Sequence, residues 1–140
     1  MPKRHNFISG ITDLLVLTIL SKGDRYIYGL TKSIQDYSEG QINISLNTVY
    51  TVTYKLENEN RISEYTKLVG KKRTRVYYHI EEAGLKYLQD LTDEFLNICS
   101  GYDAIVKALE NEPAEEDADV SNSEDLSAAG EGHFSGFGEA

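Results

Sequence analysis

Five basic side chains lie within nine residues in the middle of the chain, at Lys67, Lys71, Lys72, Arg73 and Arg75. Lysine and arginine at this density suit contact with phosphate groups, which gives affinity for a polyanion but carries little sequence information. Lys3 and Arg4, near the start of the chain, would add to the same surface. The alternative interpretation is a soluble loop tip, because basic tips also occur for that reason alone.

The stretch before this basic cluster, residues 45–62, carries residue types that read DNA bases. If it forms a helix, its outer and flanking faces present Asn47, Thr48, Thr51, Tyr54, Lys55 and Asn58. Asparagine pairs with adenine, lysine with guanine or phosphate, and a threonine methyl meets the methyl of thymine. The core would then receive Leu46, Val49, Tyr50 and Leu56. The alternative is an ordinary solvated polar face.

Local periodicity conflicts with a helix at this place. With a period of two, Leu46, Tyr50, Val52, Tyr54 and Leu56 fall on one side, and the β-branched content also favours a strand. In favour of a helix, Ser45 suits the N-cap and Asn60 tolerates the left-handed conformation that ends helices. We predict a helix, because the stretch follows a helix and precedes a hairpin with a basic tip.

The elements around this stretch complete a recognisable order. Residues 8–22 predict a buried helix that ends at Gly23, and a second helix begins at Asp24 and is broken by the polar residues 39–41. Residues 62–69 and 76–80 predict two strands, joined by a turn over the basic residues 70–75. The fold class is therefore mainly α with a small β hairpin, a winged helix-turn-helix followed by a long C-terminal helix.

That C-terminal helix has the strongest periodicity in the chain. Large apolar residues recur at spacings of 3, 4, 3, 4, 3 and 4, at Leu88, Leu91, Phe95, Ile98, Tyr102, Ile105 and Leu109. This heptad pattern predicts pairing with another helix and thus a dimer. Burial contributes about 1.5–3 kcal/mol per side chain, which outweighs the cost of roughly 1 kcal/mol at Gly101. A kink near Ser100 and Gly101 is compatible with the pattern.

The charge of the chain is distributed unevenly. Residues 1–80 hold 12 Lys and Arg against 7 Asp and Glu, whereas residues 81–140 hold 2 against 16, so the net charge of −9 conceals a basic first half. We predict a winged-helix DNA-binding domain at 1–80, a dimerisation helix at 81–110 and an acidic disordered tail at 111–140. The tail would compete with DNA for the basic hairpin and weaken non-specific binding.

The same sequence argues against several other classes of protein. Cys99 is the single cysteine, so no intrachain disulfide forms, and the longest apolar run, residues 14–20, is too short to cross a bilayer. We expect a soluble cytoplasmic protein without a membrane partner. The three histidines, His5, His79 and His133, lie in unrelated segments and predict no metal site. No nucleophile and base are paired, so we expect neither an enzyme nor a cofactor.

Three blocks of sequence resemble the PadR family of bacterial transcriptional regulators. The first is Gly10 with LLVLTIL and residues 23–30, the second is Thr48-Val49-Tyr50 with Lys55-Leu56-Glu57 and Ile62, and the third is Gly70-Lys71-Lys72-Arg73 with Tyr77-Tyr78, Ile80, Glu82-Ala83-Gly84 and Leu88. The family usually has leucine where Thr53 stands and glycine where Asn60 stands.

The resemblance implies a homodimer that represses transcription from a palindromic operator, with one winged helix on each half-site. Relatives also sense aromatic or drug-like molecules near the dimer interface, which makes Phe95, Ile98, Cys99 and Tyr102 a candidate effector site. The alternative for these four residues is plain packing between helices. Two other functions remain open: a winged-helix module that binds protein and no DNA, and a small-molecule sensor with modest affinity for DNA.

Overall fold

The computed structural model describes residues 11–114, which form four helices and a three-stranded sheet. The chain divides into two compact units, Met1–Asn97 and Ile98–Ala140, and the sheet and first three helices belong to the first unit. The predicted fold class is confirmed. In chain order the elements are α1 (Thr12–Leu20), β1 (Arg25–Tyr26), α2 (Ile27–Tyr37), α3 (Leu46–Asn58), β2 (Ile62–Val69), β3 (Arg73–Ile80) and α4 (Glu82–Glu110).

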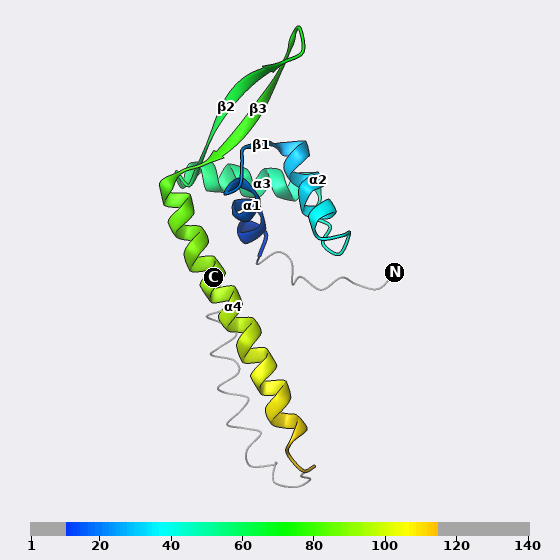
Figure 1. Ribbon diagram of the computed structural model, residues 1–140. Coiled ribbons are helices and arrows are strands. Elements are labelled where there is room, and N and C mark those ends of the chain that lie inside the picture. The colour runs from blue at the N-terminus through cyan, green and yellow to red at the C-terminus, as the bar shows by residue number, and fades with distance from the viewer. Residues whose placement is uncertain (1–10, 115–140) are drawn as a thin grey trace. The chain divides into compact units, whose positions relative to one another are not determined.

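One hydrophobic core holds the first unit together. Helices α1, α2 and α3 pack pairwise and lie below the sheet, while the β2–β3 hairpin projects past them (Figure 1). The buried apolar side chains are Val16, Leu17, Leu20, Leu30, Ile34, Val49, Leu56, Ile62, Tyr78 and Ile80. They come from α1, α2, α3 and both long strands, so their burial fixes the hairpin base relative to α3.

The stretch with conflicting periodicity is the helix α3. The Ser45 hydroxyl accepts a hydrogen bond from the Thr48 N–H at 3.1 Å, which caps the first turn. At the other end Asn60 has a φ of 60°, and the Arg61 N–H donates to the Leu56 carbonyl at 2.9 Å. This is the Schellman arrangement, in which a left-handed residue ends a helix. The two caps and the buried face outweigh the strand propensity of the threonines.

The buried face of α3 differs from the prediction at three positions. Leu46 and Tyr50, expected in the core, are 47% and 57% exposed. Thr53 is fully buried between Val49 and Leu56, because these three positions share one helical stripe. Its hydroxyl donates to the Tyr50 carbonyl at 2.9 Å, so the buried polar group is satisfied.

The second helix begins later than predicted, and a short strand precedes it. Arg25 and Tyr26 pair antiparallel with Tyr78 and Tyr77, which places β1 on the outer side of β3 and gives the sheet order β1-β3-β2. Helix α2 follows at once and ends before Glu39 and Gly40, whose φ angles are 56° and 80°. A two-residue strand has no periodicity of its own, so only its pairing with β3 reveals it.

The hairpin is longer and its turn tighter than predicted. Strand β3 begins at Arg73 rather than at residue 76, so the turn contains only Gly70, Lys71 and Lys72. Gly70 has a φ of 75°, a conformation that glycine adopts without strain. Because Lys67 pairs with Arg75 and Val69 with Arg73, two cations expected in the turn, Arg73 and Arg75, are placed by strand register instead.

Helix α4 is continuous from Glu82 to Glu110, with no interruption at Ser100 or Gly101. Its first turn lies against the start of β2, where the Glu81 N–H donates to the Arg61 carbonyl at 2.9 Å. A Cβ atom on Gly84 would come within 2.2 Å of that carbonyl oxygen, so the close approach requires glycine. No helix in residues 11–114 is long and apolar enough to cross a membrane.

Candidate nucleic-acid interface

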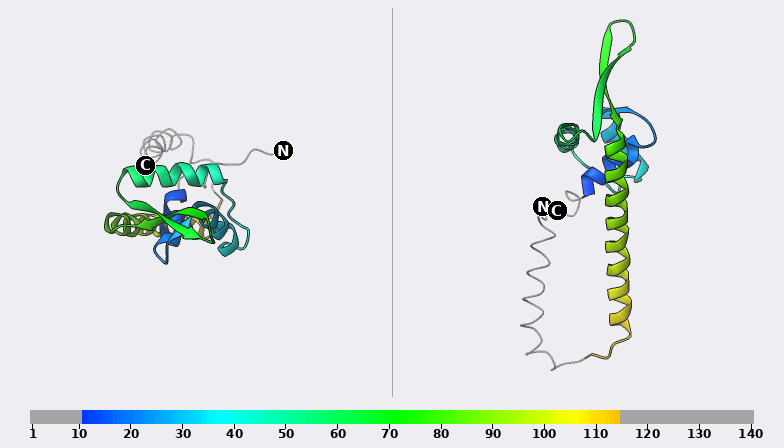
Figure 2. Two further views of the ribbon diagram at one scale, coloured as in Figure 1. Left: turned by 90° about the horizontal axis from the view of Figure 1, so that it is seen from above. Right: turned by 90° about the vertical axis from the view of Figure 1, so that its left-hand side faces the viewer.

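Helix α3 presents a polar face to solvent beside the base of the hairpin. All six side chains predicted to contact DNA from this helix are exposed, namely Asn47, Thr48, Thr51, Tyr54, Lys55 and Asn58. Seen along its axis, α3 lies next to the β2–β3 hairpin, which projects past it (Figure 2). Leu46 and Tyr50 lie on the same helix and are also exposed, and the sequence analysis assigned both to the core.

The six polar side chains differ in their intramolecular partners. Lys55 Nζ lies 2.6 Å from Asp13 Oδ2 of α1, so its charge is compensated within the chain. The hydroxyl of Thr48 bonds to Ser45 in the cap, and that of Thr51 donates to the Asn47 carbonyl. Within residues 11–114, the side chains of Asn47, Tyr54 and Asn58 have no hydrogen bond or ion pair, so their polar groups are available to an external partner.

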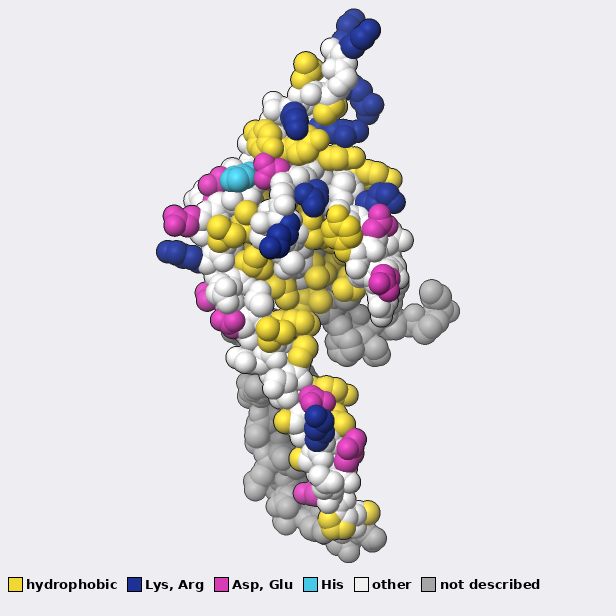
Figure 3. Space-filling view, viewed as in Figure 1, with side chains coloured by type: hydrophobic (Ala, Val, Ile, Leu, Met, Phe, Trp, Pro, Cys, Tyr) yellow, Lys and Arg dark blue, Asp and Glu magenta, His cyan; other side chains and the backbone are white. Residues whose placement is uncertain are grey.

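The basic side chains of the hairpin follow strand alternation. Lys67, Arg73 and Arg75 share one face of the hairpin with Tyr65 and Tyr77, because residues directly opposite one another point the same way. We call these five residues the basic face. Lys71 and Lys72 lie in the turn beyond it. Figure 3 shows Lys and Arg side chains in dark blue at the tip of the hairpin.

Aromatic rings rather than carboxylates hold two cations of the basic face. Lys67 Nζ lies 5.3 Å from the centroid of the Tyr77 ring, and the Arg75 guanidinium lies 4.1 Å from that of Tyr26. No Asp or Glu oxygen of the described residues lies within 4.0 Å of a lysine or arginine nitrogen on the hairpin. A cation held on a ring keeps its full charge for an external anion.

A solvent-accessible hydrogen-bond cluster connects the α1–β1 turn to the hairpin. Asp24 accepts from the Tyr65 hydroxyl at 2.7 Å, and its other oxygen lies 2.9 Å from His79 Nδ1. Burial acts to raise the pKa of Asp24, but the hydrogen bonds from Tyr65 and His79 outweigh it and lower that pKa. The hydrogen bond with Asp24 also raises the pKa of His79. No sequence signal links these residues, which are brought together only by folding.

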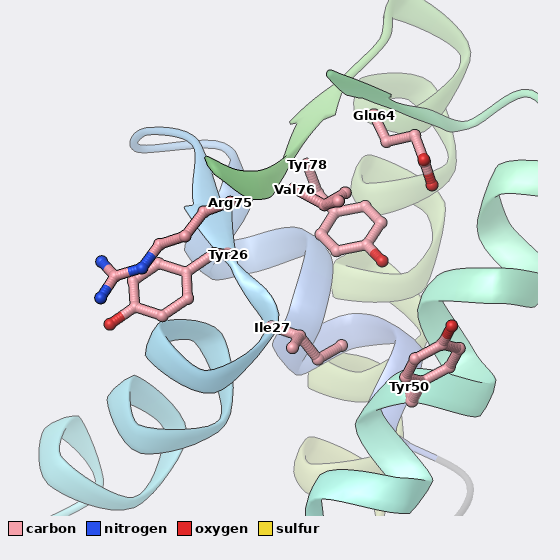
Figure 4. A pocket seen from close by; sticks show the side chains of 7 residues that line it. All are labelled: Tyr26, Ile27, Tyr50, Glu64, Arg75, Val76 and Tyr78. Carbon is pink, nitrogen blue, oxygen red and sulfur yellow. The ribbon is translucent and has the colours of Figure 1, made fainter. Parts of the chain in front are cut away.

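The opposite face of the hairpin borders a groove of about 340 Å³. Its walls come from β1, α2, α3 and both long strands (Figure 4), and are formed by Tyr26, Ile27, Tyr50, Glu64, Arg75, Val76 and Tyr78. Beside it, burial, a hydrogen bond with Glu64 and repulsion from Glu64 raise the pKa of Glu57 from 4.5 to about 7. Of the groove residues, only Arg75 was predicted to contact a ligand, namely DNA, whereas Tyr50 was predicted to lie in the core.

The heptad residues of α4 are of two kinds. Leu88 and Leu91 are half-buried and pack against the core of the same chain. The remaining five, Phe95, Ile98, Tyr102, Ile105 and Leu109, are exposed. Cys99, named with three of these residues as a candidate effector contact, is exposed as well. The groove described above includes none of the four residues considered for effector binding.

Two further predictions concern residues outside 11–114, the part of the chain that the structure describes. Lys3 and Arg4 lie before residue 11, and most of the acidic stretch 111–140 lies after residue 114. Within residues 11–114 no group of three His, Cys, Asp or Glu side chains is placed to hold a metal ion.

The three helices, the hairpin and the exposed α3 define the class of winged helix-turn-helix proteins. Similar proteins of known structure support this class. A transcriptional regulator from Clostridium thermocellum is 27% identical, with a TM-score of 0.67, over 75% of this chain and 99% of that one. A PadR family regulator from Eggerthella lenta is 29% identical, with a TM-score of 0.60, over 74% and 85%. An uncharacterized protein from Lysinibacillus sphaericus is 29% identical over 76% and 98%.

The sequence profile of the transcriptional regulator PadR-like family matches residues 16–90, which is more than half of the 140 residues. The chain belongs to this family, as the sequence analysis predicted. Family membership makes it a transcriptional regulator that acts through DNA, and not an enzyme.

Proposed function

We propose that the protein is a homodimeric repressor that binds a palindromic operator, with one α3 helix in the major groove of each half-site. The observation that carries this proposal is the position of an exposed polar helix beside a hairpin whose cations lack carboxylate partners. Such a pair would supply both kinds of DNA contact, because the helix would read base edges and the hairpin would hold phosphates.

Roles within this proposal follow from the contacts of each side chain. Asn47, Tyr54 and Asn58 read base edges, and Thr48 and Thr51 contribute methyl or hydroxyl contacts. Lys55 would have to leave Asp13 to reach DNA, so we assign it a smaller part. Lys67, Lys71, Lys72, Arg73 and Arg75 hold phosphates, with Lys3 and Arg4 as additions from the N-terminal segment.

The dimer in this proposal forms through α4. Phe95, Ile98, Tyr102, Ile105 and Leu109 repeat with heptad spacing and expose large apolar side chains. A second copy of the helix would bury them, because a coiled-coil partner covers such a stripe. We assign DNA binding to residues 1–80 and dimerisation to residues 81–110. An effector at Phe95, Ile98, Cys99 and Tyr102 would then act at the dimer contact.

A gel shift with the DNA upstream of the protein's own gene tests the proposal. We expect a discrete complex, and we expect Asn47→Ala and Asn58→Ala to weaken it by about 1–3 kcal/mol each while non-specific binding stays constant. Asn111→Ala, beyond the end of α4, is the matched control. The competing function, a winged helix that binds protein only, predicts no complex with any duplex.

A further inference from the structure

The groove between α3 and the hairpin carries an unusual charge arrangement for a surface next to DNA. At one end lie Glu64 of β2 and, beside it, Glu57 of α3. Within residues 11–114 no Lys, Arg or His nitrogen lies within 4.0 Å of either carboxylate. This end repels a phosphate, so the DNA backbone is a poor occupant of it.

The walls of the groove are aromatic and aliphatic. Figure 4 shows Tyr78 near the middle, with Tyr50 and Glu64 on one side and Tyr26 with Arg75 on the other. Ile27 and Val76 complete the apolar lining. Aromatic rings beside a carboxylate that has no cationic partner are the surroundings in which organic cations bind, since ring faces carry partial negative charge.

Arg75 fixes which end of the groove a cation can use. Its guanidinium already covers the Tyr26 ring, 4.1 Å from the ring centroid, and repels a second positive charge there. The favourable position for a cation is therefore the opposite end, between Glu64, Tyr50 and Tyr78. An apolar ring attached to that cation would point toward Ile27 and Val76.

We propose that this groove binds a compact organic cation that carries an aromatic ring. The volume of about 340 Å³ accommodates one ring with a small charged substituent, at the lower end of the range for ligand sites. The raised pKa of Glu57 agrees with this assignment, because it reports that a second negative charge beside Glu64 is unfavourable without a cation. The site is distinct from the positions on α4 considered for an effector.

Occupation of the groove has a consequence that rests on the proposed function. Tyr50 belongs to α3 and Glu64 and Val76 belong to the hairpin, so a ligand between them contacts both DNA-binding elements. A bound ligand would lie between α3 and the hairpin, and its bulk would oppose the approach of DNA to both elements. We expect ligand and operator to compete, which makes the site a direct means of release.

Isothermal titration calorimetry of the full-length protein with three matched probes tests the site without DNA. We expect benzyltrimethylammonium to bind in the millimolar range or better, at least about tenfold tighter than benzyl alcohol, with phenylacetate weakest. Glu64→Gln should weaken the cation at least about tenfold, and Tyr50→Leu should also weaken it. The control Glu94→Gln, an exposed carboxylate of α4 that does not line the groove, should leave binding unchanged.

A second measurement distinguishes failure of the proposed cation site from failure of the proposed DNA-binding function. Fluorescence anisotropy of a labelled operator is recorded with benzyltrimethylammonium and with tetramethylammonium at the same ionic strength, and only the former should raise the Kd for DNA. Equal binding of all three calorimetric probes, or a cation affinity unaffected by Glu64→Gln in a folded variant, would overturn the site. A protein that binds the cation but no DNA would instead contradict the proposed function.

Discussion

The two faces of the hairpin have opposite chemistry although they come from the same two strands. The basic face carries Lys67, Arg73 and Arg75 among tyrosine rings, whereas the groove face carries Glu64, Thr66, Leu68, Thr74, Val76 and Tyr78. Arg75 is the one cation of the hairpin whose side chain also lines the groove. Strand alternation alone separates the two sets. A count of basic residues therefore overstates how many hairpin cations point toward the groove beside α3. In our proposal the basic face holds phosphates and α3 reads base edges.

Removal of the basic face should have the largest effect. The variant Lys67→Ala/Arg73→Ala/Arg75→Ala should lower DNA affinity by about 100-fold or more near 0.1 M salt and reduce the magnitude of the salt slope by about 5 for a dimer, because six phosphate contacts are lost. The matched variant Thr66→Ala/Thr74→Ala on the groove face should change affinity little. Equal losses in the two variants would remove the distinction between the faces.

The distinction also requires that the base of the hairpin be held in place. Gly84→Ala should destabilise the fold by about 2–3 kcal/mol, since its Cβ would meet the Arg61 carbonyl oxygen. Gly101→Ala, with no atom within 4 Å of the added Cβ, should stabilise the helix by about 0.5–1 kcal/mol. Urea denaturation of both variants measures these changes in the free energy of unfolding. A Gly84→Ala variant as stable as the unmodified protein would show that the backbone shifts at little cost to make room for the added Cβ.

The neighbouring carboxylates Glu57 and Glu64 beside the groove should make the stability of the fold depend on pH. The folded state raises the pKa of Glu57 from 4.5 to about 7, so it binds more protons than the unfolded chain between those values. Stability should therefore fall as pH rises from 4.5 to 7, by about 1–2 kcal/mol, since solvent screens part of the repulsion. Glu57→Gln should remove that loss. An unchanged pH profile in the variant would assign the titration to another group.

The smallest effect concerns how the rings position the cations. Tyr77→Leu should weaken DNA binding by about two- to fivefold, because Lys67 loses the ring that orients it, while the salt slope stays the same. Tyr77→Phe keeps the ring and should retain affinity. Anisotropy titrations at several salt concentrations separate the two quantities, and a reduced slope in Tyr77→Leu would mean that the cation itself no longer contacts phosphate.

Much of this architecture could be predicted from the sequence where the signals are local. Ser45 and Asn60 indicated the ends of α3, and the heptad spacing indicated α4. The periodicity of α3 was misleading because Thr53 is buried at a position where a polar residue appears to belong to the surface. Its hydroxyl is satisfied by a backbone carbonyl, which the sequence does not show.

The groove and the Asp24 cluster could not be predicted, because both depend on pairing across the chain. Arg75 appeared to belong to an irregular turn until its register opposite Lys67 placed it in β3. Asp24 and His79 are 55 residues apart and meet only when β1 adds to the sheet. Contacts of this kind depend on tertiary structure and leave no spacing pattern along the chain.

The salt dependence of binding to a duplex from upstream of the gene tests the DNA-binding function most directly. If each dimer neutralises about six to ten phosphates, log K plotted against log salt concentration should fall with a slope of about −5 to −9. The slope should become shallower in the basic-face variant and remain steep in the groove-face variant. A flat response of the unmodified protein would contradict DNA binding by α3 and the hairpin.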